Sequence, residues 1–162
     1  MDETTRILLA SLAHQRSHVL GILEGLPDEA LRRPVLPSGW TCLGLVQHLA
    51  LDVERFWFRV IVTGELELPA ADAPSAWEVG PETTADEVLA LYRSEAELAD
   101  EVIRSLPLDT APAVWPTELF GDFRLRDLRA VLVHVLTETA THAGHLDAAR
   151  ELLDGRQWLT LT

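Results

Sequence analysis

The amino-acid sequence predicts an all-α protein in which four long helices pack around one core. Prolines and glycines fall in clusters that divide the 162-residue chain into four long segments. Within each segment, apolar residues recur at spacings near three and four, which is the period of a helix with one buried face. The sequence contains no internal repeat, heptad array or low-complexity tract. Four amphipathic helices with loops long enough to cross an end of the molecule favour a four-helix bundle.

The first two helices are predicted from their boundary residues. Asp2 is a plausible N-cap for a helix over residues 3–24, because Gly25-Leu26-Pro27 would end it there. A turn-rich stretch over residues 33–40 follows. The second helix then runs from residue 43 to about residue 62 and is closed by Gly64.

The third and fourth helices have comparable signals. Thr83 or Thr84 caps the third, and Glu87 completes a capping box with Thr84, so that this helix extends to about Ser105. The fourth runs from about residue 126 to 153. We expect irregular structure at 65–83 and 108–124, with a short hairpin at Phe120-Gly121-Asp122-Phe123 as the minor alternative for the second of these loops.

Composition restricts the class of partner. The formal net charge is −13, and all 13 basic residues are arginines, since the chain contains no lysine. Nucleic acids and anionic membrane surfaces are therefore disfavoured partners, because both require clustered positive charge. The N-terminal residues lack the basic and apolar regions of a signal peptide, and apolar runs are shorter than the ~18 residues of a membrane span. We expect a single soluble domain over residues 1–162 in the cytoplasm.

The single cysteine, Cys42, cannot form an intramolecular disulfide, which fits a reducing compartment. A small buried hydrophobic residue is the favoured interpretation of Cys42. Its place near the start of a helix leaves a lowered thiol pKa as the minor alternative.

Polar residues gather on one face of the fourth predicted helix. At about 100° per residue, His134, Glu138, His142 and His145 lie within about 80° of one another. Apolar residues share that face, so part of the polar group is expected to point inward, where unpaired polar atoms are costly. A divalent metal would satisfy a buried acid and imidazole together.

Spacing suggests which residues would bind that metal. Glu138 and His142 are one turn apart and can reach one ion, and His48 is the candidate third ligand because it is the only histidine of the second helix and lies among leucines and valines. Three protein ligands would leave an open position, as in catalytic sites. His134 and His145 compete with this set, either as ligands or as residues that orient one. From the residues alone, a hydrogen-bonded or solvent-facing cluster without metal is the favoured alternative.

Other residues are candidates for contacts to a ligand. Arg55 and Arg59, beyond Asp52 on the second helix, could bind an anionic cofactor or substrate, although surface arginines usually pair with nearby acids. Trp77 and Trp115 lie in predicted loops, where an aromatic ring either shapes a pocket mouth or anchors its loop to the helices.

Two motifs identify a resemblance to a known family. They are Ser38-Gly39-Trp40-Thr41-x-Leu43-Gly44-Leu45-Val46-x-His48-Leu49 with Glu54-Arg55-x-Trp57-Phe58, and His134-x-x-x-Glu138-x-x-x-His142-Ala143-Gly144-His145-x-Asp147. Both resemble the DinB-like superfamily, and more narrowly its actinobacterial branch grouped with mycothiol-dependent enzymes. The resemblance covers nearly the whole chain.

The resemblance implies an up-down-down-up four-helix bundle that forms a homodimer. It also implies a divalent metal, usually zinc or nickel, bound by His48, Glu138 and His142. Many relatives have histidine where this chain has Glu138, so the donor set here is mixed.

We therefore hypothesise a metal-dependent transferase whose metal-bound thiol, such as mycothiol, attacks an electrophilic small molecule. His145 or His134 would then orient a ligand or relay a proton. Two alternatives are a metal-binding, stress-related bundle without turnover and a metal-free homodimeric interaction bundle.

Overall fold

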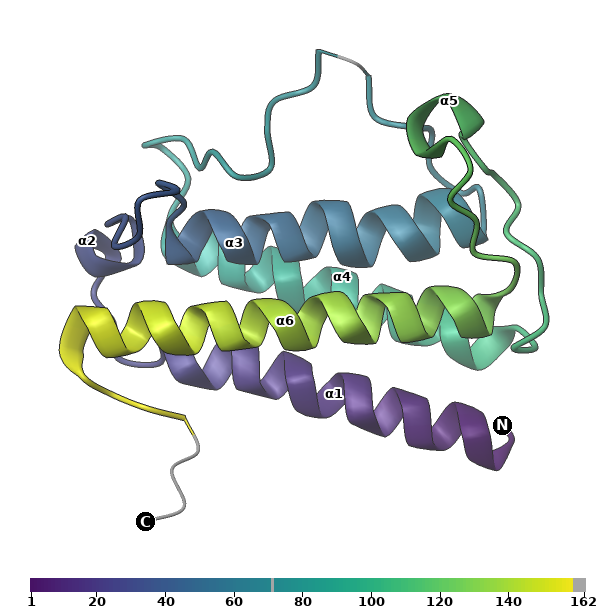
Figure 1. Cartoon of the computed structure of the whole chain (residues 1–162), viewed down its shortest axis with the longest axis horizontal. Helices are drawn as coiled ribbons and strands as arrows, with labels where there is room; N and C mark the ends of the chain where they lie inside the picture. Colours follow the sequence, from purple (N-terminus) through teal and green to yellow (C-terminus); the bar gives the residue numbers. More distant parts are fainter. Residues whose placement is uncertain (71, 159–162) are drawn as a thin grey trace.

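The computed structural model describes residues 1–70 and 72–158 (Figure 1). Its elements, in chain order, are α1 (Glu3–Leu23), α2 (Asp28–Leu31), α3 (Cys42–His48), η1 (Leu49–Val62), α4 (Ala85–Ser105), α5 (Thr117–Phe120) and α6 (Leu128–Asp154). These described residues contain no β-strand, which confirms the all-α prediction. None of their helices is both long enough and apolar enough to cross a membrane.

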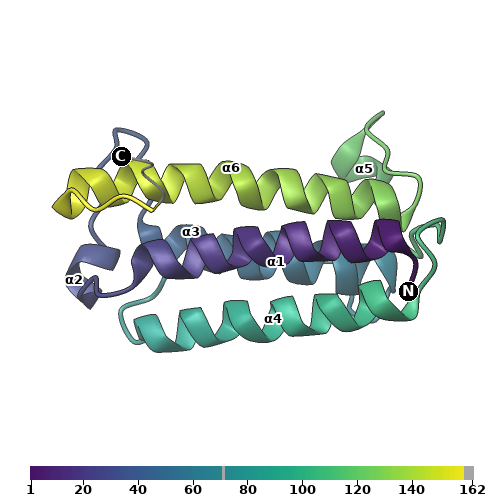
Figure 2. The same ribbon diagram turned by 90° about the horizontal axis from the view of Figure 1, so that it is seen from below.

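Four long helical segments lie side by side (Figures 1 and 2). One of them consists of two elements, because α3 continues directly into η1. The backbone hydrogen bonds of η1 are of the wider π type. The most extensive packing is between α1 and α6 and between α4 and η1, with further contacts of η1 to α6 and of α1 to α4. In the two views, α1 and α6 run one way while α3, η1 and α4 run the other. A long loop after η1 therefore returns along the molecule before α4 begins.

Local capping groups set the helix ends much as the sequence predicts. Asp2 caps α1 by accepting a 2.8 Å hydrogen bond from the Thr5 backbone N–H, and Thr84 and Glu87 form the predicted capping box of α4. The fourth helix starts two residues later than predicted, because Asp127 is its N-cap and accepts a hydrogen bond from the Ala130 N–H.

Two short helices were not predicted. Residues 28–31 form α2 directly after Pro27, whose fixed φ suits a helix start. Residues 117–120 form α5 after Pro116, so Phe120 ends a helical turn and the minor hairpin alternative at residues 120–123 is wrong. Both segments are single turns, too short to show an apolar period in the sequence.

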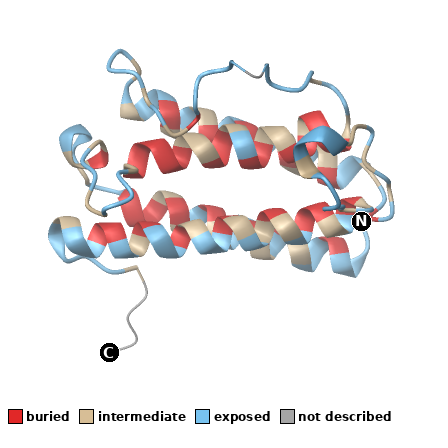
Figure 3. Ribbon diagram, turned by 45° about the horizontal axis from the view of Figure 1, so that its top comes forward, coloured by how far each residue is buried: buried red, intermediate tan, exposed pale blue. Residues whose placement is uncertain are grey.

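The core fills the space between the long helices, and their facing sides carry the buried residues while the loops are largely exposed (Figure 3). Charged residues are buried there as well. Arg16 of α1 donates two hydrogen bonds of 2.7 and 2.6 Å to the carboxylate of Glu54 on η1, whose side chain is fully buried. Arg16 also pairs with Asp100 of α4 at 2.6 Å, so a single guanidinium links three helices.

Candidate metal centre

His48 is the last residue of α3 and is oriented by its own helix. The Thr41 side chain caps α3 by accepting a 3.0 Å hydrogen bond from the Gly44 N–H. One turn after His48, the Asp52 carboxylate lies 2.9 Å from His48 Nδ1. Since an ionised carboxylate only accepts, Nδ1 carries the proton and Nε2 keeps its lone pair free.

The second half of the site comes from α6. Buried residues Val135, Thr139 and Ala143 fix the inward face of this helix, and Glu138 and His142 lie at the edge of that face. Glu138 Oε2 is 3.6 Å from His142 Nε2. The His142 side chain is only 13% exposed and that of Glu138 is 39% exposed, so the carboxylate remains accessible to solvent.

His145 lies one turn beyond His142 and contacts it. The two Nδ1 atoms are 3.3 Å apart, so one ring donates to the other. When His142 donates, its Nε2 is left as an acceptor on the Glu138 side. This contact is compatible with the prediction that His145 orients a ligand, which stays a prediction.

The fold brings His48, Glu138 and His142 together, and each residue offers a ligand atom within 4.8 Å of the others. Two imidazoles and one carboxylate form a donor set typical of divalent transition metals such as zinc. Both Nδ1 atoms are engaged by neighbouring side chains, which leaves the two Nε2 atoms for one ion. The residues present therefore fit a metal site with three protein ligands, which leaves at least one coordination position to a non-protein ligand.

The electrostatics keep His142 in the form that a metal requires. Burial lowers the pKa of His142, and the neighbouring His48 lowers it further, while Glu138 opposes both effects. The imidazole is thus neutral at neutral pH. Only a neutral imidazole offers a lone pair to a cation.

Trp77 covers this cluster, a role that sequence reasoning left open. Its ring stacks on His48 with centroids 4.1 Å apart and lies edge-on to His142 at 5.8 Å. The loop carrying Trp77 approaches α3 closely, because a Cβ on Gly44 would lie 2.3 Å from the Trp77 carbonyl oxygen. Gln47 also donates a 2.9 Å hydrogen bond to the Ala76 carbonyl. A glycine at the start of a helix was the signal in the sequence for this close approach.

His134 lies in a different environment from the other three α6 residues. Its ring packs edge-on against Trp57, with centroids 4.7 Å apart, and is tilted against Phe123 at 5.8 Å. Burial lowers the pKa of His134, while Glu138 opposes the shift. Among the described residues it has no hydrogen-bond partner, so its predicted role as ligand or relay stays a prediction.

Arg55 and Arg59 already have carboxylate partners. Arg55 donates to Glu95 of α4 at 2.7 Å, and Arg59 pairs with Glu95 at 3.2 Å and with Glu65 at 2.6 Å. Their guanidinium groups are thus held by acids on α4 and in the loop after η1. The predicted cofactor contact of either arginine would need these ion pairs to rearrange.

Cys42 is buried, as the sequence predicts, with 1% of its surface exposed. Burial raises the pKa of its thiol to about 11, the opposite of activation by the helix dipole. Trp115 packs against Trp57 and Phe120, so it anchors its loop to the helices.

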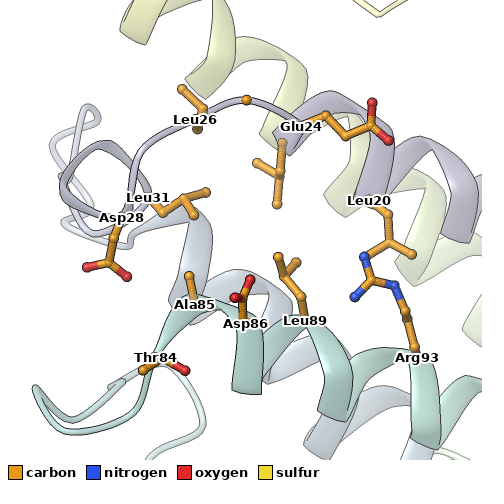
Figure 4. A pocket seen from close by; sticks show the side chains of 12 residues that line it. Leu20, Glu24, Leu26, Asp28, Leu31, Thr84, Ala85, Asp86, Leu89 and Arg93 are labelled. Carbon is orange, nitrogen blue, oxygen red and sulfur yellow. The ribbon is translucent and has the colours of Figure 1, made fainter.

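A separate cavity of about 500 Å³ lies where α1 ends and α4 begins (Figure 4). Leucine side chains from both helices line it, and the charged residues Glu24, Asp28, Asp86 and Arg93 lie at separate points around it. None of the described residues that line this cavity is a histidine. It is therefore distinct from the cluster of His48, Glu138 and His142.

Fold and site together define an all-helical protein with a half-buried His-Glu-His cluster of the kind that binds a divalent metal. A family model described as mycothiol-S-transferase matches residues 7–155, and the chain belongs to this family. The comparisons with curated proteins and with solved structures gave no match. The sequence-based assignment to the mycothiol-dependent branch is therefore confirmed.

Proposed function

We propose that this protein is a metal-dependent mycothiol S-transferase. The cluster of His48, Glu138 and His142, with ligand atoms within 4.8 Å of one another, carries the proposal. Family membership supplies the thiol, and the cluster supplies a place for zinc or nickel. The proposal includes the up-down-down-up bundle as a single domain, a cytoplasmic location and a homodimer.

A divalent cation in this cluster would favour the thiolate form of a thiol bound to it. Neighbouring residues of the chain orient the histidines that would bind this cation. Asp52 accepts from His48 Nδ1, and His145 contacts His142 Nδ1, so the Nε2 atoms are the ones left as ligand atoms for an ion. The thiol sulfur then forms a bond to an electrophilic carbon, the leaving group departs with its electron pair, and the thiol proton passes to solvent.

Spectroscopy of cobalt-substituted protein tests the thiol step. Titration with mycothiol is expected to produce a sulfur-to-cobalt charge-transfer band, because the three protein ligands leave a position open. The S-methyl derivative of mycothiol, which cannot form a thiolate, is the matched control and is expected to produce no band. Metal uptake without a thiol band would instead support a metal-binding protein without turnover.

Asp52→Ala is expected to weaken metal affinity by about 10–100-fold, since the carboxylate fixes the tautomer and orientation of His48. Asp52→Asn keeps an acceptor oxygen at the same place and is expected to recover most of that loss. Competition with a chromophoric chelator measures both affinities.

Asp147→Ala is the matched control for Asp52→Ala. Asp147 also accepts from a histidine, His18 of α1, at 2.8 Å, but this pair is separate from the His48 cluster. Its removal is expected to leave metal affinity unchanged. Equal losses in Asp52→Ala and Asp147→Ala would contradict the orienting role of Asp52.

A further inference from the structure

A largely apolar groove lies beside the candidate metal centre. It has a volume of about 590 Å³, within the usual range for small-molecule sites. Three segments form it: η1, the loop after η1 and the turn of α5. Its apolar lining includes Phe56, Trp57, Leu68, Pro116, Leu119 and Phe120.

Aromatic rings form a preorganised surface in this groove. Trp57 and Phe120 stack with centroids 5.4 Å apart and an interplanar angle of 14°. Phe56 contacts both rings edge-on. Leu119 and Leu68 complete the lining although they are 65% and 43% exposed, and covering such side chains with an apolar ligand is favourable.

The charges of the groove select against anions. Of the described residues that line it, Asp52 and Glu118 are the charged ones, and none is an arginine or a histidine. Arg59 is held by Glu65 and Glu95 instead. A neutral ligand avoids the repulsion that a carboxylate or phosphate would meet here.

The groove connects with the metal centre through two residues. Asp52 lines the groove and is also bound to His48 Nδ1 at 2.9 Å. Trp57 lines it as well and contacts His134, which lies one turn before Glu138 on α6. The Asp52 end of the groove is therefore one hydrogen bond away from a ligand of the proposed metal.

We propose that this groove binds the electrophilic cosubstrate, and that this cosubstrate is a neutral aromatic molecule whose reactive carbon lies at the Asp52 end. The inference rests on the proposed function. For an arylmethyl chloride, a sulfur–carbon bond forms, the carbon–chlorine bond breaks, chloride leaves with the electron pair, and the thiol proton passes to solvent. The groove thus assigns the substrate class that the cluster alone leaves open.

Binding of an unreactive analogue tests the groove independently of turnover. The dissociation constant of 4-methylbenzyl alcohol is measured by ligand-observed NMR for wild type, Leu119→Glu and Leu152→Glu. Leu119→Glu is expected to weaken binding at least fivefold, because it places a charge on the apolar wall. Leu152, on the last turns of α6, is similarly exposed at 60% and does not line the groove, so Leu152→Glu is expected to bind like wild type.

A charged analogue tests the preference of the groove for a neutral ligand. The anion 4-(hydroxymethyl)benzoate is expected to bind wild type at least tenfold more weakly than 4-methylbenzyl alcohol, and Glu118→Gln is expected to reduce that difference. Equal binding of the two molecules, equal binding to wild type and Leu119→Glu, or no binding of the neutral molecule to wild type would overturn the proposal.

Turnover of 4-methylbenzyl chloride with mycothiol separates this inference from the proposed function. Turnover that Leu119→Glu leaves unchanged overturns the groove assignment while the transferase stands. A Leu119→Glu variant whose kcat/KM falls because KM rises while kcat stays similar supports both. Absence of turnover with every electrophile refutes the transferase and, with it, the assignment of the groove to an electrophile.

Discussion

His142→Ala is expected to reduce bound metal from about one ion per chain to background. The variant removes one of three ligand residues, and the remaining pair, His48 and Glu138, come from different helices. Two ligands on separate helices hold an ion far less well than three, since the site depends on all of them reaching one point. Elemental mass spectrometry on untagged protein, purified without added metal, measures the content.

His14→Ala is the matched control for this experiment. His14 is an exposed histidine of α1, and its side chain forms no hydrogen bond with the described residues. It is expected to keep the metal content of wild type. Both variants should also keep a wild-type melting profile in the presence of a chelator, because neither side chain is in the apolar core.

Two outcomes would contradict the proposed centre. If His142→Ala retains its metal, other residues hold the ion, with His145 and His134 as the next candidates on α6. If wild type contains no metal even after dialysis against zinc and nickel, the transferase mechanism fails. The metal-free interaction bundle would then be the better interpretation.

The helices were predictable because their signals are local. The Asp2 cap, the Thr84–Glu87 capping box and the apolar period lie within a few residues of the boundaries that they set. The π-type hydrogen bonding of η1 had no such signal, since an apolar period alone does not distinguish it from an α-helix. Clusters of proline and glycine predicted where the loops between the long helices lie.

The metal cluster was predictable from a mixture of spacing and resemblance, whereas its surroundings were not. Glu138 and His142 share a face because they are four residues apart, and His48 was the one histidine of its helix. Trp77 is 29 residues from His48 in the chain, and no sequence period connects them. Likewise, Arg59 lacks a predictable partner in sequence because Glu95 lies 36 residues away on α4.

The buried Arg16–Glu54 pair was missed for the same reason, and it leads to the second large expected effect. Arg16→Met should lower the free energy of unfolding by about 3–5 kcal/mol, because it leaves the Glu54 carboxylate buried and uncompensated. The Glu54 side chain is 0% exposed, so water cannot replace the two lost hydrogen bonds. Asp100 is less affected, since it also accepts from Arg104 at 2.7 Å.

The double variant Arg16→Met/Glu54→Leu separates two effects of removing Arg16: the loss of the ion pair and the burial of an uncompensated Glu54 carboxylate. It should recover most of the lost stability, to within about 1–2 kcal/mol of wild type, because replacing both members of a buried pair by apolar residues is often nearly neutral. Urea unfolding followed by circular dichroism compares the three proteins. A double variant no more stable than Arg16→Met would show that packing by Arg16, rather than charge compensation, is what α1 contributes here.

The pH dependence of the free energy of unfolding tests independently whether the uncompensated Glu54 carboxylate destabilises Arg16→Met. Burial raises the pKa of the Glu54 carboxyl, and in wild type the Arg16 guanidinium opposes that shift. Without Arg16, the folded state holds the Glu54 proton to a higher pH than the unfolded state does. Stability from this group is then fully present below the unfolded pKa and is lost as pH rises through the folded pKa. The deficit of Arg16→Met relative to the double variant should therefore be small at about pH 5 and larger at about pH 8, whereas an equal deficit at both would mean that Glu54 does not carry the charge responsible.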